Sequence, residues 1–147
     1  MDARVSAGFE VRWLGPDDEA LAARALRDVV GDDLAPGWLG GAGLHFAVVT
    51  VEGVPAGVAF GHTLPLPDGR TELLLYSLDV AEPYRRTGIG RALALAFRER
   101  ARALGFDEAW VLTDTDNEAG NATYRSAGGE AAPPATMYTW TVGRPGG

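Results

Sequence analysis

A basic, glycine-bearing segment between an extended apolar run and a helical pattern has the residue types of an anion-binding loop. The apolar run covers residues 71–80, and an alanine- and leucine-rich helix is predicted from Arg91 to about Leu104. Glycines let the backbone approach a ligand closely, and the free N–H groups and dipole of a helix's first turn favour phosphate. Arginine side chains add charge-assisted donors. The residues predicted to cradle a pyrophosphate are Arg85, Arg86, Thr87, Gly88, Ile89, Gly90 and Arg91.

Two other phosphate-binding motifs do not fit this segment. A P-loop requires Gly-x-x-x-x-Gly-Lys-Ser/Thr, and the chain contains no lysine. A dinucleotide fingerprint requires Gly-x-Gly-x-x-Gly, and Leu93 stands where the third glycine is needed. An ordinary glycine-rich turn between a strand and a helix is the alternative that the motif leaves open.

Composition excludes several other kinds of chemistry. The chain has no cysteine, and therefore no disulfide framework, thiolate zinc site or cysteine nucleophile. Its two histidines, His45 and His62, lack metal-ligand spacing, so we expect each to be a surface or hydrogen-bonding residue near a strand end and predict no metal. The net charge of −7 disfavours nucleic acid and favours small cationic ligands, although solubility alone also explains an acidic surface.

The sequence shows neither a membrane span nor a targeting segment. No apolar run reaches 18 residues, and residues 1–5 do not have the form of a signal peptide. We therefore expect a cytoplasmic protein without a membrane partner. The 147 residues are enough for one domain with a buried core, and no repeat or linker is found. The expected domain covers residues 1–147, with its core at about residues 9–142.

Hydrophobic periodicity and turn residues predict a mixed α/β order of elements. The expected strands span residues 9–13, 46–51, 54–61, 71–80, 109–113 and 137–142. The expected helices are one that begins at Gly15-Pro16 and ends at Gly31, a short helix or loop near Trp38, the helix from Arg91, and a last helix between Thr115 and Gly128. The last helix opens with the capping-box form Thr-x-x-Glu, and the strand at residues 109–113 is expected to be buried.

The cradle resembles motif A of the GNAT superfamily of acetyl-CoA-dependent N-acetyltransferases, whose signature reads Gln/Arg-x-x-Gly-x-Gly/Ala. The matching residues run from Arg85 to Gly90. A second segment, from Asn117 through Tyr124 to Gly128, resembles the family's Asn-…-Tyr-…-Gly helix and follows at a fitting distance. The resemblance covers about residues 9–142. It implies a GNAT-like mixed, splayed central sheet flanked by helices, with acetyl-CoA as the co-substrate.

Acetyl transfer to an amine requires a held thioester, a deprotonated amine, a stabilised oxyanion and a protonated leaving thiolate. The resemblance implies direct transfer in a ternary complex. It places the backbone of Leu78-Asp79-Val80 beside the pantetheine arm, makes Tyr124 the general acid, and lets Asn117 contact the cofactor arm. Packing of Tyr124 against the sheet and capping of its helix by Asn117 are the alternative roles of these two residues.

The sequence leaves the general base open. Histone-type members of the family carry a glutamate at the position of Leu74. Glu72 lies two residues earlier, on the same face of the strand, and is the first candidate. Asp79 and Asp114 are further candidates, because both are predicted near strand ends that face the cleft.

Within the family the chain resembles the type I aminoglycoside 3-N-acetyltransferases. The resemblance rests on five features: Glu72 with Tyr76, the Arg85-Arg86 pair, the helix length from Arg98 to Gly105, the acidic stretch 114–118 before Tyr124, and residues 136–140. Ser77 departs from it, because that group tends to carry aspartate there. The resemblance implies transfer to the 3-amino group of an aminoglycoside, a small polycation, and hence antibiotic resistance. The implied substrate-binding residues are Asp79, Asp114, Asp116 and Glu118. Asp32 and Asp33 are further carboxylates that could attract a polycation to the same cleft.

Three alternatives remain at this stage. The acceptor could be another small amine or a protein N-terminus, since carboxylates at residues 114–118 also suit helix capping. The chain could instead be a non-catalytic GNAT-like sensor that binds an acyl-CoA. A homodimer is compatible with the resemblance.

Overall fold

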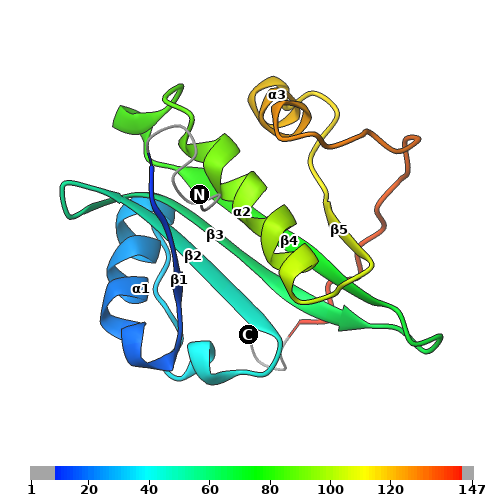
Figure 1. Cartoon of the computed structure of the whole chain (residues 1–147), viewed down its shortest axis with the longest axis horizontal. Coiled ribbons are helices and arrows are strands. Elements are labelled where there is room, and N and C mark those ends of the chain that lie inside the picture. Colours follow the sequence, from blue (N-terminus) through cyan, green and yellow to red (C-terminus); the bar gives the residue numbers. More distant parts are fainter. Residues whose placement is uncertain (1–8, 144–147) are drawn as a thin grey trace.

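The computed structural model describes residues 9–143, which form a mixed five-stranded sheet with helices on both sides (Figure 1). The strand order is β1-β2-β3-β4-β5; the first four strands are antiparallel neighbours, and β5 runs parallel to β4. The strands are β1 (Val11–Leu14), β2 (Leu44–Val51), β3 (Val54–Pro65), β4 (Thr71–Val80) and β5 (Glu108–Val111). The helices are α1 (Glu19–Ala25), α2 (Ile89–Ala103) and α3 (Glu118–Ser126). Short helical turns are η2 (Pro16–Asp18), η3 (Leu26–Val30), η4 (Trp38–Gly40) and η5 (Glu82–Tyr84).

The predicted order of strands and helices is confirmed from β1 to α3. The strand that enters the cradle spans the predicted ten residues, and the first helical region ends at Gly31, whose φ of 89° only glycine adopts readily. Helix α2 begins at Ile89, earlier than the predicted Arg91, because Gly88 takes a left-handed conformation (φ 97°) and forms the N-cap. The cradle therefore extends into the first turn of α2.

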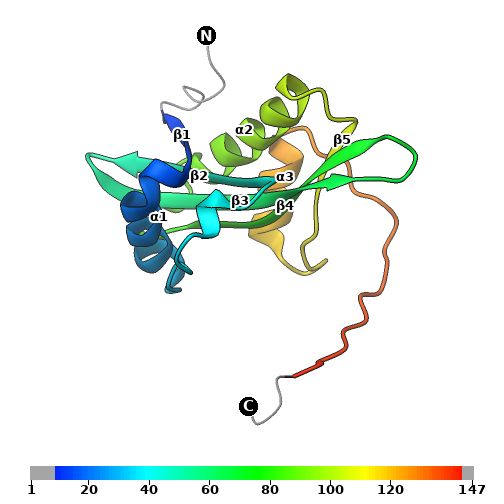
Figure 2. The same ribbon diagram turned by 90° about the horizontal axis from the view of Figure 1, so that it is seen from below.

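The two faces of the sheet are covered by different helices, α1 on one and α2 on the other (Figure 2). Alternation along the strands divides their side chains between two cores. In β2, Ala47 and Val49 belong to the larger core under α2, whereas Phe46 and Val48 belong to the smaller core under α1. The α1 side of the sheet is open to solvent further along, where Tyr76 of β4 is 65% exposed.

Two glycines in β3 allow α2 to pack closely on the sheet. A Cβ atom at Gly57 would lie 2.6 Å from Cγ2 of Ile89, and one at Gly61 would overlap the carbonyl oxygen of Leu74. The register of β3 with β4 shifts next to Gly61, which leaves Tyr76 as an extra residue in β4. This bulge turns the second half of β4, which is the half that enters the cradle.

A buried histidine links β2, β3 and α2. His45 is 6% exposed, and Nε of Arg100 donates to its Nδ1 over 2.8 Å. The ring proton is therefore on Nε2, which lies 2.7 Å from Oγ1 of Thr63 and donates to it. The Arg100 guanidinium also lies 4.1 Å above the ring of Trp13. His45 thus has the predicted hydrogen-bonding role, but it performs it inside the fold.

The prediction of a final strand at residues 137–142 is wrong. No helix or strand forms between Gly129 and Gly143, and this segment extends away from the sheet (Figure 2). The side chains of Met137, Tyr138 and Trp140 are 77–80% exposed. Alternation alone does not make a strand, because its backbone groups need a neighbouring strand for their hydrogen bonds.

Two local predictions also need correction. Strand β5, predicted to be buried, is the edge strand of the sheet, and its residues Glu108 and Ala109 are exposed. Helix α3 starts at Glu118, so its N-cap is Asn117 and the predicted box at Thr115 does not form. Oδ1 of Asn117 accepts a hydrogen bond from the Gly120 N–H over 3.1 Å.

We expect His45 to make the stability of the fold depend on pH. Burial, followed by the Arg100 charge, lowers the pKa of His45 from 6.5 to about 4, so the folded state favours the neutral ring. The stabilisation is complete above pH 6.5 and should be lost as the pH falls from 6.5 to 4. Between pH 6.5 and pH 4, the free energy of unfolding measured with urea should fall less for His45→Gln than for the parent protein. His62→Gln, which keeps His45, should follow the parent; an equal decline in all three proteins would contradict this assignment.

Candidate active site

The first feature of the site is a gap between β4 and β5. Their parallel ladder joins Glu72–Leu75 to Glu108–Val111 and ends there, although β4 continues to Val80. Residues 76–80 of β4 therefore keep an open backbone edge on this side within the described chain. The peptide-like arm of a ligand can pair with such an edge as an added strand. The predicted thioester-binding residues, Leu78, Asp79 and Val80, all lie on it.

The cradle continues directly from this edge into α2. No side chain caps α2, and its first backbone bond of the i to i−4 type runs from Ala92 to Gly88. The N–H groups of residues 88–91 therefore have no acceptor in the helix. Arg86 has a φ of 62°, which is uncommon for a residue with a side chain. The loop thus presents backbone donors and the positive end of the helix dipole to an anion.

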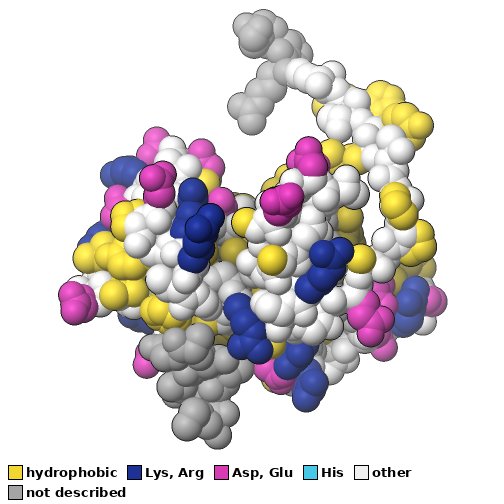
Figure 3. Space-filling view, turned by 90° about the horizontal axis from the view of Figure 1, so that it is seen from above, with side chains coloured by type: hydrophobic (Ala, Val, Ile, Leu, Met, Phe, Trp, Pro, Cys, Tyr) yellow, Lys and Arg dark blue, Asp and Glu magenta, His cyan; other side chains and the backbone are white. Residues whose placement is uncertain are grey.

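Three arginines surround the cradle, and two of them also hold it together. Nε of Arg85 donates to the carbonyl of Val80 over 3.1 Å, and Nε of Arg91 donates to the carbonyl of Ser126 over 3.0 Å. Arg86 lies between them on the exposed loop. Figure 3 views the edge of the molecule that carries this loop and α3, and arginine side chains gather there. Thr87 donates to the Tyr84 carbonyl and so shapes the loop.

Helix α3 closes the other side of the gap. A Cβ atom at Gly90 would lie 3.3 Å from Cγ2 of Thr123 and 3.7 Å from Cδ2 of Leu78, so the cradle, α3 and β4 meet at this glycine. Asn117 caps α3 and donates through Nδ2 to Oγ1 of Thr113 over 2.8 Å. The alternative role of Asn117 is therefore present in the structure and fixes the start of α3.

Tyr124 extends from α3 toward β4. It packs against the core under α2, and burial followed by the negative charge of Asp79 raises its pKa above the ordinary value of 10. Asp79 in turn accepts a hydrogen bond from Oγ of Ser77 over 2.9 Å. The structure thus brings Tyr124 and Asp79 together at the open edge, and the phenol keeps its proton at neutral pH.

Glu72 lies at the other end of β4. Its Oε1 accepts a hydrogen bond from Nε1 of Trp110 over 3.0 Å, and its Oε2 lies 3.9 Å from the guanidinium of Arg70. The side chain is 15% exposed. Glu72 is on the paired part of β4, seven positions from Asp79, so the structure does not place it with Tyr124.

The predicted acceptor-binding carboxylates lie in the loop between β5 and α3. Asp114, Asp116 and Glu118 are exposed, and none forms an ion pair with another described residue. In Figure 2 the start of α3 lies on the α1 side of the sheet and its end lies on the α2 side. These carboxylates therefore flank the open part of the α1 face.

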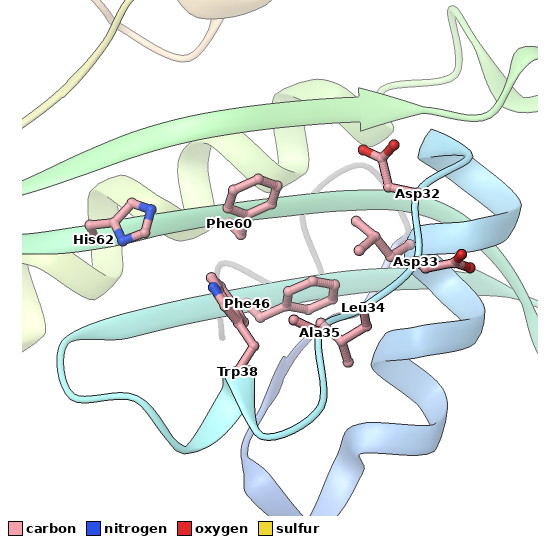
Figure 4. Close-up of a pocket in the computed structure, with 9 residues that line it drawn as sticks. Asp32, Asp33, Leu34, Ala35, Trp38, Phe46, Phe60 and His62 are labelled. Carbon is pink, nitrogen blue, oxygen red and sulfur yellow. The ribbon is translucent and has the colours of Figure 1, made fainter. Parts of the chain in front are cut away.

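An aromatic pocket on this face is the feature that sequence reasoning missed. It has a volume of about 440 Å³ and lies between η3, η4 and the strands β2 and β3 (Figure 4). Its lining residues are Leu26, Asp32, Asp33, Leu34, Ala35, Trp38, Phe46, Phe60 and His62. They come from distant parts of the chain, so no single motif identifies them. The alternation of side chains along the β2–β3 hairpin indicated only that some of these side chains share a face of the sheet.

Stacked rings connect this pocket to the open edge of β4. Trp38 meets Phe60 edge-on at 5.8 Å, and Phe60 stacks on Tyr76 with the same separation of ring centroids. His62 meets Tyr76 edge-on at 5.9 Å. The extra residue in β4 is therefore an exposed tyrosine whose ring contacts two residues that line the pocket.

The two carboxylates of the pocket differ in their partners. Asp33 forms an ion pair with Arg27 at 3.1 Å. Asp32 forms no ion pair with any of the described residues. Figure 4 shows the two carboxylates pointing in different directions. Asp32 is thus available to a cation that enters the pocket.

Residues 9–143 include no helix long and apolar enough to span a membrane. In the same part of the chain, no three His, Asp or Glu side chains are arranged to hold a metal ion.

Comparison with known proteins identifies the fold and the reaction class. The family model described as Acetyltransferase (GNAT) family matches residues 11–128, which include the open edge, the cradle and Tyr124. The chain belongs to the GNAT acetyltransferase family. It is an acetyl-CoA-dependent N-acetyltransferase with the GNAT fold, as the motif resemblance predicted. No curated protein sequence matches it significantly.

Solved structures with the GNAT fold include enzymes with different acceptors. An aminoglycoside acetyltransferase from an uncultured soil metagenomic sample, in complex with sisomicin, is 17% identical, with a TM-score of 0.78 over 95% of this chain and 99% of that chain. Aminoglycoside N-acetyltransferase AAC(6')-Iy in complex with CoA is 17% identical, with a TM-score of 0.73 over 90% and 94%. Ribosomal-protein-alanine N-acetyltransferase from Brucella melitensis biovar Abortus 2308 is 19% identical, with a TM-score of 0.73 over 92% and 99%. At these identities the likeness shows the fold, and the 3-N type is not singled out.

We expect Gly88→Asp to weaken binding of acetyl-CoA by this GNAT enzyme. The new side chain would place a negative charge and a strained backbone at the N-cap of α2. Loss of one charge-assisted contact costs about 1.5–3 kcal/mol, so the dissociation constant in isothermal titration should rise by roughly ten- to a hundredfold. Gly69→Asp is the matched control, because Gly69 has a similar φ of 91° in the hairpin far from the cradle. Unchanged affinity of Gly88→Asp would exclude the cradle as the anion site.

Proposed function

We propose that this GNAT enzyme transfers the acetyl group of acetyl-CoA to an amine of a small polycation, most simply an aminoglycoside, by direct transfer in a ternary complex. The observation that carries the proposal is the open edge of β4, with the Gly88 cradle at its end and Tyr124 at its side. The pyrophosphate occupies the cradle, and the pantetheine arm pairs with residues 78–80. A backbone N–H of this segment then polarises the thioester carbonyl.

Tyr124 acts as the general acid in this proposal. When the amine nitrogen bonds to the carbonyl carbon and the carbon–sulfur bond breaks, the leaving sulfur takes the proton of the Tyr124 hydroxyl. The raised pKa of Tyr124 supports this role, because burial and the charge of Asp79 keep the hydroxyl protonated until it is needed. A proton from water restores the phenol. Packing of the Tyr124 ring against the core under α2 is compatible with this role.

Asp79 is the base that the geometry favours. It lies on the open edge, beside both Tyr124 and the segment that would hold the thioester. A carboxylate there can accept the proton that the incoming ammonium must lose, directly or through water. Glu72, the first candidate from sequence, has Trp110 and Arg70 as its partners instead. We therefore assign Glu72 to orientation of β5 and the loop before β4.

The acceptor would lie across the open part of the α1 face. One ammonium group would enter the aromatic pocket, where Asp32 supplies a charge and Trp38 an electron-rich ring face. The carboxylates Asp114, Asp116 and Glu118 would bind further ammonium groups on the other side of Tyr76. Several separated negative sites suit a molecule with several ammonium groups better than a monoamine. Transfer to the 3-amino group stays a prediction from the sequence resemblance. Determining which amine of the product carries the acetyl group would test it.

We predict that Tyr124→Phe lowers turnover by about a hundredfold while acetyl-CoA affinity changes little. The phenol proton is removed, whereas the ring that packs on the core is kept. Release of coenzyme A followed with a thiol reagent gives the turnover number, and titration calorimetry gives the affinity. Asp79→Asn should also lower turnover, whereas Glu72→Gln should leave it within about twofold. An unchanged turnover number in Tyr124→Phe would leave the tyrosine with a packing role only.

We predict that Asp32→Asn raises the Michaelis constant for an aminoglycoside, and that the increase is larger at low ionic strength. The interaction is Coulombic and is screened over about 10 Å at 0.1 M salt. Asp33→Asn is the matched control, because Asp33 is adjacent in sequence but paired with Arg27.

Coenzyme A release should be tested with aminoglycosides, monoamines and peptides. Release with peptides or monoamines alone would reject the polycation, and binding of acetyl-CoA with no turnover on any amine would favour an acyl-CoA sensor.

A further inference from the structure

The aromatic pocket on the α1 face is lined by four rings in a crossed arrangement. Phe46 and Phe60 are paired across β2 and β3, and their rings are nearly parallel, with an interplanar angle of 9°. The ring of Trp38 in η4 is nearly perpendicular to both, at 74° and 82°. His62 crosses Phe60 at 87° and Trp38 at 85°. These four residues, here named the aromatic cage, line the pocket from two strands and one helical turn (Figure 4).

The core beneath the cage holds its rings in place. Phe46 is 1% exposed and belongs to the smaller core, and Trp38 and Phe60 pack against the same core. The ring of Phe60 also stacks on Tyr76 of β4. Rings that are already positioned lose little side-chain freedom when a ligand binds, so a preformed cage favours binding.

The charge at the cage is negative. Among the described residues that line the pocket there is no lysine or arginine, whereas Asp32 and Asp33 both line it. The carboxylate of Asp33 is paired with Arg27, and that of Asp32 has no ion-pair partner in the described chain. Aromatic ring faces attract cations, and a nearby carboxylate adds to the attraction. The pocket is therefore complementary to a cation rather than to a neutral apolar group.

The hydrogen-bond acceptors of the pocket indicate which kind of cation fits. A primary ammonium carries three N–H donors, and a guanidinium carries five. Among the described residues that line the pocket, the side chains with an acceptor atom are Asp32, Asp33 and His62, and Asp33 already has a partner. An N–H group that loses water without gaining an acceptor costs free energy. Methyl groups on the nitrogen remove these donors and keep the positive charge, so a methylated ammonium suits the cage best.

We propose that the aromatic cage binds a methylated ammonium group of the acceptor. This inference rests on the proposed function and narrows its substrate class: one methylated ammonium anchors the acceptor, and a separate primary amine takes the acetyl group. A fully methylated nitrogen has neither a lone pair nor an N–H, so the anchor itself is not acetylated. The pocket volume of about 440 Å³ also leaves room for the part of the molecule that carries the anchor. From the cage, the acceptor would pass the exposed ring of Tyr76, the first residue of the open part of β4.

Three probes of the same length test the cage without any acetyl transfer. Choline carries a trimethylammonium group, ethanolamine carries a primary ammonium, and neohexyl alcohol is the uncharged analogue of choline with carbon in place of nitrogen. In titrations followed by proton NMR, choline should bind at least about tenfold more tightly than either of the others. Its N-methyl signal should move upfield, because the methyl groups lie against ring faces. Equal affinity for ethanolamine would indicate a purely ionic site, and equal affinity for neohexyl alcohol a purely apolar one; either result, or no binding of choline, would overturn the proposal.

Substitutions locate this binding within the pocket. Trp38→Leu should raise the dissociation constant of choline by about tenfold. Trp140→Leu is the matched control, because Trp140 is 80% exposed and does not line the pocket. Asp32→Asn should weaken binding of choline but not of neohexyl alcohol, and Asp33→Asn should weaken choline much less. Unchanged affinity for acetyl-CoA in titration calorimetry checks that each variant is folded. If Trp38→Leu and Asp32→Asn both leave choline affinity unchanged, the methylated ammonium binds elsewhere and the proposal fails.

The link to acetyl transfer is tested separately by release of coenzyme A. For diamines of equal length, trimethylation of one end should lower the Michaelis constant by about tenfold with little change in turnover number, and Trp38→Leu should abolish this preference. A preference for the unmethylated diamine would contradict the proposal. If no amine is acetylated, the proposed function fails, and choline binding still decides whether the cage exists. If aminoglycosides are acetylated but choline does not bind, the cage proposal alone fails.

Discussion

The early end of the β4–β5 ladder is the constraint on which the rest of the site depends. Parallel pairing stops at Leu75 and Val111, so the second half of β4 has one bonded side and one open side. An unpaired edge inside a protein must find hydrogen-bond partners in a ligand or in water. The proposed function uses three features beside this opening: the unpaired edge of β4, the glycine-bearing loop at its end, and Tyr124 of α3.

Charge separation follows from this arrangement. The cradle carries Arg85, Arg86 and Arg91 at one end of the gap, although the chain as a whole has a net charge of −7. The acidic residues at 114–118 lie at the start of α3, on the face that also holds the aromatic pocket. An anionic co-substrate and a cationic acceptor would therefore approach different sides of the same strand.

Sequence reasoning succeeded where chemistry is local in the chain. The strand, the glycine-bearing turn and α2 are contiguous, so their order and approximate bounds could be predicted from residue types and spacing. The expected role of residues 78–80 came from the family resemblance. Sequence reasoning failed for the strand at residues 137–142, since a strand exists only with a partner. It also could not show that Trp110 and Arg70 are the partners of Glu72 in the fold. Which carboxylate is the base stays a proposal.

The sequence by itself determined the mixed α/β order and the glycine-bearing turn before α2, because glycine conformation and hydrophobic periodicity act over short distances along the chain. The reaction class came from the resemblance of two of its segments to the GNAT motifs, and the family match confirms it. The tertiary structure alone decided that Tyr124 lies near enough to Asp79 for its charge to raise the tyrosine pKa, and that Trp38, Phe60 and Tyr76 stack across the sheet. Such contacts depend on strand register, on the bulge in β4 and on the angle of α3. These quantities are set by packing between residues far apart in sequence, and no local pattern encodes them.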